Sequence, residues 1–89
     1  MSGMLGMDTG AVRTLAGHLG TKAEEIDSLT AALTSELDGV QWMGTDGDTF
    51  RNDWHTTYRN QLSTISSALR DASSRAVSNA VQQEEASAR

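Results

Sequence analysis

The sequence predicts an all-α protein, an antiparallel hairpin of two long helices that dimerises into a four-helix bundle. Three observations point to this fold. Apolar residues recur at helical spacing through two long blocks, one short glycine-containing break separates the blocks, and no proline interrupts either of them. With 89 residues and a mass of 9.5 kDa, the chain is expected to form a single domain over residues 1–89.

The first helix is expected over residues 8–38, because its apolar positions alternate in steps of three and four. The full register consists of Leu5, Val12, Leu15, Leu19, Ile26, Leu29, Leu33 and Val40, so it starts before the helix and ends after it. Only Asp8, Lys22 and Glu36 interrupt this register. A repeat of 3.5 residues is typical of helices that pack nearly parallel to other helices. Either Asp8 or Thr9 is expected to cap the start of the helix.

The connection between the helices is expected at residues 39–45, where glycines replace the apolar stripe. Gly39 suits the left-handed position that often ends a helix, and Trp42-Met43-Gly44 follows near the midpoint of the chain. A tryptophan at this point can wedge between the helix ends and bury about 200 Å² of apolar surface. A connection this short predicts an antiparallel hairpin.

The second helix is expected over residues 46–82, with a capping box formed by Thr45 and Asp48 at its start. Its apolar residues follow steps of four and three, and its opposite face is rich in serine. The stripe consists of Phe50, Trp54, Tyr58, Leu62, Ile65 and Leu69, after which it continues with alanine. Residues 1–7 and 83–89 contain little to bury and are expected to fray.

Each stripe is wider than one partner helix can cover, so a single hairpin would leave apolar surface exposed. Leu, Ile, Val and Phe make up only about 17% of the residues, which makes a lone chain of this length marginally stable. A second hairpin would complete the core. The stripe residues from Val12 to Leu33 and from Phe50 to Leu69 are therefore the expected bundle and dimer interface, and the partner is either a second copy or a related hairpin.

Composition argues against several classes of protein. The chain has no cysteine, which excludes disulfides and thiolate metal sites. Its net charge of −5 argues against nucleic-acid binding, and no apolar run approaches the length of a membrane span. His18 and His55 are isolated, and Asp46-Gly47-Asp48 lacks the remaining ligands of a calcium loop. We therefore expect no enzymatic activity, catalytic residue, cofactor, metal site or stable membrane insertion.

The segment around the break carries the most specific pattern. Phe50 follows Trp42 by eight residues, and a second tryptophan, Trp54, comes four residues later. Together with Trp42, Gly44 and the two flanking helices, this segment resembles the WXG family of one-hundred-residue proteins, the early-secreted-antigen-like substrates of type VII (ESX) secretion, in its actinobacterial form. The resemblance covers essentially the whole chain. Thr45 stands where actinobacterial relatives often have proline, which changes only the helix cap.

The resemblance implies a small non-enzymatic protein that acts as a homo- or heterodimeric bundle and is exported folded by a type VII secretion ATPase. The protein would be cytoplasmic before export, and secreted or on the cell surface afterwards, by a route other than Sec. The family's Tyr-x-x-x-Asp/Glu export signal is not found, because Leu62 lies four residues after Tyr58; Val81, Glu85 and Ala88 fit a looser form in part. The alternative is a cytosolic adaptor that pairs with a larger type VII toxin and targets it for export.

Overall fold

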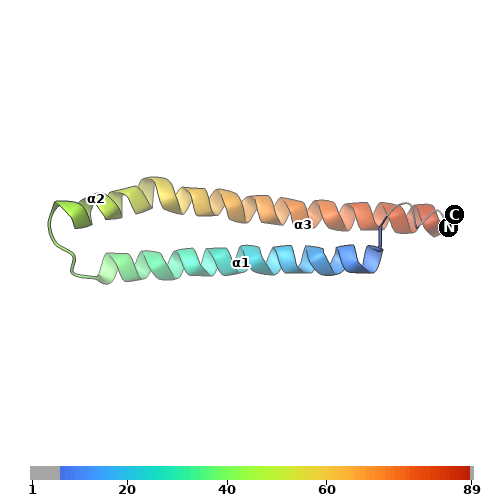
Figure 1. Ribbon diagram of the computed structural model, residues 1–89, viewed down its shortest axis with the longest axis horizontal. Helices are drawn as coiled ribbons and strands as arrows, with labels where there is room; N and C mark the ends of the chain where they lie inside the picture. The colour runs from blue at the N-terminus through green and yellow to red at the C-terminus, as the bar shows by residue number, and fades with distance from the viewer. Residues whose placement is uncertain (1–6, 89) are drawn as a thin grey trace.

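The computed structural model, which describes residues 7–88, shows one antiparallel pair of long helices (Figure 1). The first helix, α1, spans Thr9–Gly39, and the second comprises α2 (Thr45–Asp53), the π-helical segment η2 (Trp54–Tyr58) and α3 (Arg59–Ala88). The predicted all-α hairpin is therefore confirmed. Its extents are 66 × 16 × 14 Å, and its radius of gyration is 19.7 Å, against about 12 Å for a compact domain of this length. This rod shape leaves most side chains at least partly exposed.

Asp8 caps the start of α1; the sequence had indicated either Asp8 or Thr9. Its Oδ1 accepts a hydrogen bond from the backbone N–H of Ala11 at 3.0 Å. The expected left-handed glycine at the other end is wrong, because Gly39 has no positive φ and the chain leaves α1 through Val40 in an extended conformation. Within residues 7–88 the positive φ lies instead at Gly44, with a value of 95°. The positive φ therefore lies in the Trp42-Met43-Gly44 break, where the chain was expected to reverse, and not at the end of α1.

The predicted capping box at the start of α2 is also wrong. Gly44 occupies the N-cap position, and no side chain caps this helix end. Thr45 is the first residue inside the helix, and the backbone N–H of Asp48 donates to the carbonyl of Gly44 at 3.1 Å. Asp46 and Asp48 lie in the first turn, where carboxylates interact favourably with the positive end of the helix dipole.

The second helix contains one residue more than a regular α-helix would accommodate between its two halves. In η2 the backbone N–H of Arg59 donates to the carbonyl of Trp54, five residues earlier, which is the π-helical pattern. Trp54 and Ser66 would point about 120° apart in an uninterrupted α-helix. Because the π turn absorbs one residue, they share a face, and both are buried against α1.

The seam between α1 and α3 is made of small residues, so the two helices approach closely. Ala16 and Ala23 on α1, and Ser66 and Ala80 on α3, are buried. The Ser66 hydroxyl donates to the carbonyl of Ala23 at 3.2 Å, and the Ser73 hydroxyl donates to the carbonyl of Ala16 at 2.8 Å. The larger stripe residues consequently lie beside the seam rather than in it.

The second helix continues to Ala88, beyond the end expected near residue 82. Two interactions hold this part of α3 against α1. Ala80 is buried in the seam, and Glu84 accepts two hydrogen bonds from the Arg13 guanidinium, at 2.7 and 3.0 Å. Of the ends that were expected to fray, residues 1–6 and 89 lie outside the described residues.

Candidate functional site

The hairpin carries large apolar side chains that it does not bury. The exposed ones on one side of the molecule are Leu15, Leu29 and Leu33 from α1, Val40 directly after it, and Phe50, Tyr58 and Ile65 from the second helix. We call this set the open apolar face. Leu15 is 53% exposed and Leu29 is 51% exposed, although both belong to the apolar stripe of α1. Large apolar side chains gathered on one exposed face usually mark a binding surface.

Helix geometry explains why the two rows of exposed residues share one side. Leu15 precedes the buried Ala16 by one residue, which turns it about 100° away from α3. Ile65 likewise precedes the buried Ser66, which turns it about 100° away from α1. Because the helices are antiparallel, these two rotations have opposite senses and bring both side chains to the same face of the hairpin.

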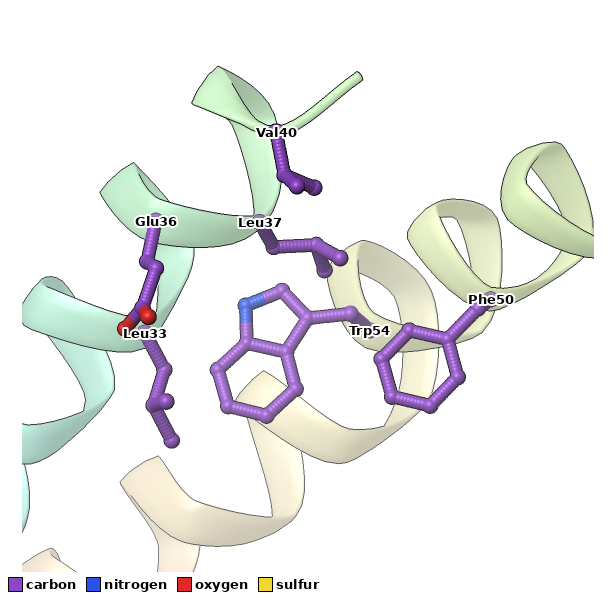
Figure 2. Close-up of a pocket in the computed structure, with 6 residues that line it drawn as sticks. All are labelled: Leu33, Glu36, Leu37, Val40, Phe50 and Trp54. Atoms are coloured by element: carbon purple, nitrogen blue, oxygen red, sulfur yellow. The ribbon is translucent and has the colours of Figure 1, made fainter. Parts of the chain in front are cut away.

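A hollow of about 310 Å³ opens in this face near the connection (Figure 2). Its lining residues come from both helices and are Leu33, Glu36, Leu37, Val40, Phe50 and Trp54. In Figure 2 the indole of Trp54 extends from the second helix toward Leu33 and Leu37. The indole is 8% exposed, and its Nε1–H donates to the Thr34 hydroxyl at 2.8 Å. Glu36 supplies the only ionisable side chain in the lining.

The expected wedge between the helix ends is Trp54 rather than Trp42. Trp42 is 40% exposed and extends the open apolar face toward the connection. Its ring centroid lies 5.5 Å from that of Phe50, which in turn lies 6.4 Å from that of Tyr58. These tilted contacts form an aromatic row along the surface. Both the carbonyl and the Cγ atom of Trp42 lie close above Gly47 of α2, while the rest of the ring remains partly exposed.

The connection is held in one shape by residues that the sequence analysis did not single out. The Arg51 guanidinium donates to the carbonyls of Val40 and Trp42, each at 2.9 Å, and to that of Leu37 at 3.4 Å. A guanidinium at this position satisfies carbonyls that the end of α1 leaves unpaired. Gly47 is buried beneath this segment, and a Cβ atom there would overlap the carbonyl oxygen of Trp42.

The opposite face of the hairpin is polar and contains the interhelical ion pairs, Arg70–Asp27 at 2.6 Å and Arg13–Glu84 at 2.7 Å. The nearby Ser66 hydroxyl and the hydrogen bond from Arg70 lower the pKa of Asp27, and the hydrogen bond from Arg13 lowers the pKa of Glu84. The Glu84 carboxylate in turn raises the pKa of Arg13. These pairs are exposed, so each contributes little to stability.

The structure places the sequence-predicted interface residues in three groups. Trp54 is buried, and the residues already assigned to the open apolar face are exposed. The remaining five are half-buried along the edge of the seam: Val12, Leu19, Ile26, Leu62 and Leu69. Trp42 and Gly44 lie in the connection. In α3, Val81 is half-buried, whereas Glu85 and Ala88 are exposed.

The histidines are not brought together. His55 Nε2 lies 3.0 Å from Asp38 Oδ1, across the end of α1, whereas His18 is exposed on α1. The part of the chain that the structure describes has no group of three or more His, Cys, Asp or Glu residues arranged to hold a metal ion. Over the same residues, no helix has the length and apolar character needed to cross a bilayer.

Comparison with known proteins gives no assignment: no family model, no curated protein and no solved structure matches this chain. The open apolar face, with its hollow and aromatic row, is therefore the candidate site on physical grounds alone. The interaction that this face can offer is apolar contact with another surface.

Proposed function

We propose that this protein is a small secreted, non-enzymatic interaction protein of the WXG type, exported by a type VII secretion system as a dimeric helical bundle. The open apolar face is the observation that carries this proposal. It presents Leu29, Ile65 and Phe50 to solvent from a hairpin only 14–16 Å thick, and within residues 7–88 no third layer covers them. Burying such a face against another hairpin would supply the hydrophobic stabilisation that a lone hairpin lacks.

The aromatic row and the shape of the connection support the same proposal. Trp42, Phe50 and Tyr58 extend the open apolar face to the end of the rod. Aromatic side chains are enriched in the cores of protein interfaces, because they bury a large area with few rotatable bonds. Arg51 holds the backbone carbonyls around Trp42, which reduces the conformational entropy that binding would cost.

Light scattering and sedimentation of the purified full chain test the dimer. We expect twice the monomer mass of 9.5 kDa, strong helicity, and dissociation in Ile65→Asp, which places a charge on the open apolar face. Ser74→Asp, on the exposed polar side of α3, is the matched control and should stay dimeric. A helical, folded monomer at high concentration would contradict the proposal. A poorly folded chain that recovers only when co-expressed with a larger partner would favour the adaptor alternative.

Export is tested by secretion from a host with an intact or deleted type VII ATPase. We expect the protein in the culture medium or at the cell surface only when the ATPase is present. Removing residues 82–89 deletes Glu85 and Ala88, two of the three residues of the candidate signal, and should reduce export while leaving most of the helicity. Glu84→Gln, which changes one charge in the same segment outside the signal, is the control. Undiminished secretion of the truncated chain would refute the role of the tail.

A further inference from the structure

Two charged side chains stand in the apolar stripe of α1, and their positions are symmetric. Lys22 lies seven residues before Leu29, and Glu36 lies seven residues after it. Residues seven apart in an α-helix are only about 20° apart around the axis. Leu15, Lys22, Leu29 and Glu36 therefore form one row along α1, and this row belongs to the open apolar face.

The surroundings of these two side chains are consistent with a missing partner. Glu36 lines the apolar hollow, and no ion pair joins its carboxylate to a cation within residues 7–88. The Lys22 side chain is 66% exposed and pairs only with Glu25, one turn away on the same helix, at 3.1 Å. Exposed pairs of this kind contribute little to stability. Covering Glu36 with an apolar surface would leave a buried charge without a counter-charge, which is strongly unfavourable.

We propose that the open apolar face binds a second copy of this chain in an antiparallel arrangement, in which Lys22 of each copy pairs with Glu36 of the other. This proposal rests on the proposed dimer and specifies its partner and register. A two-fold axis passing close to Leu29 places the two leucines against each other. It then places each Lys22 opposite a Glu36, with the two ion pairs about 21 Å apart at 1.5 Å per residue.

A parallel arrangement of two copies would leave Lys22 without an acidic residue opposite it. If both connections lay at the same end, α1 of one copy would cover α3 of the other. Lys22 would then face the level of Ile65 and Leu69, where the open side of α3 is uncharged. Charge thus favours the antiparallel register.

Charge reversal in single chains and in mixtures tests the register. Lys22→Glu and Glu36→Lys each place like charges opposite each other in a homodimer, and we expect each to weaken dimerisation by roughly 30-fold or more. In an equimolar mixture of the two variants, one chain carries two acids and the other carries two lysines. The mixture should therefore regain dimerisation as a heterodimer with affinity close to that of the unmodified chain. The double variant Lys22→Glu/Glu36→Lys should regain it as a homodimer.

Glu24→Lys is the matched control, because Glu24 is exposed on the other side of α1 and the substitution changes the net charge by the same amount as Glu36→Lys. All substitutions exchange good helix formers, and circular dichroism checks that each chain remains helical. A monomeric unmodified chain would refute the proposed dimer itself. If Lys22→Glu and Glu36→Lys each dimerise as well as the Glu24→Lys control, the antiparallel register is refuted while dimerisation stands. The same holds if the equimolar mixture of the two variants does not regain dimerisation. A complex formed only with an unlike hairpin would also overturn it.

Discussion

Replacing each tryptophan with alanine separates the structural role of Trp54 from that of Trp42. Trp54 is 8% exposed, whereas Trp42 is 40% exposed. Truncating a fully buried tryptophan typically costs about 3–5 kcal/mol. Scaled by the buried fraction, Trp54→Ala should destabilise the hairpin by about 3–5 kcal/mol and Trp42→Ala by about 2–3 kcal/mol. The hydrogen bond from the Trp54 indole to Thr34 increases the difference, since its loss removes about 1 kcal/mol.

Urea unfolding followed by far-UV circular dichroism measures both changes. All samples need the same protein concentration, because association would add to the apparent stability. With a urea dependence of about 1–3 kcal/mol per molar, Trp54→Ala should lower the unfolding midpoint by at least about 1 M relative to the unmodified chain. Trp54→Phe retains most of the buried area and removes the indole N–H. Its unfolding midpoint should therefore lie between those of the unmodified chain and Trp54→Ala.

An equal or larger loss of stability in Trp42→Ala would refute this reasoning. This holds for samples dilute enough to be monomeric, where it would mean that the hairpin itself covers Trp42 more fully than Trp54 and that the partition of the two tryptophans is wrong. Fluorescence quenching provides an independent check. At concentrations where the chain is monomeric, the emission of the Trp54→Phe chain should be accessible to a neutral quencher, and that of a Trp42→Phe chain should be protected.

Three further outcomes follow from the same structure. Gly47→Ala should destabilise the protein by about 1–3 kcal/mol, because the added Cβ would overlap the carbonyl of Trp42. Gly17→Ala, in open space on α1, should instead stabilise it by about 1 kcal/mol. Equal shifts of the two melting temperatures would contradict the close approach of the Trp42 backbone to Gly47. Deleting Thr57 removes the extra residue of the π turn and should preserve folding, whereas deleting Ser67 from the regular helix should rotate its two halves apart and unfold the chain; circular dichroism of the two deletions decides this. The pKa values of Asp27 and Glu84 are lowered from their ordinary values of 3.8 and 4.5 by the interhelical ion pairs. The stability that these carboxylates contribute is therefore present above the ordinary values and is lost as the pH falls through and below them. Melting temperatures should therefore drop on acidification below about pH 4.5, and a flat profile down to pH 3 would exclude this linkage.

The two helices were predictable because their signal is local. The recurrence of apolar residues along each block depends only on the helical repeat, so the pattern indicated α1 and the second helix without knowledge of any contact. The π turn also left a trace. Phe50, Trp54, Tyr58 and Leu62 follow one another in three successive steps of four, where a regular stripe alternates three and four. An extra residue between two regular segments produces this spacing.

The details of the connection were not predictable in the same way. Arg51 caps α1 from the other helix, and the residues that it binds lie between nine and fourteen positions earlier. Gly47 is required by the passage of the Trp42 backbone, which no local pattern reports. Both roles depend on contacts between residues that are distant in the sequence, whereas the positive φ of Gly44 in the connection was predictable from its place in the break.

The sequence by itself determined that this protein is a pair of long amphipathic helices with a short break, because the spacing of apolar residues sets the face that each helix presents. Only the tertiary structure decided which part of each face the hairpin buries. Small residues such as Ala23 and Ser66 allow the closest approach of the helix axes, so they form the seam. Large residues such as Leu29 and Ile65 are displaced to one side, since the same close approach leaves no room for them between the helices.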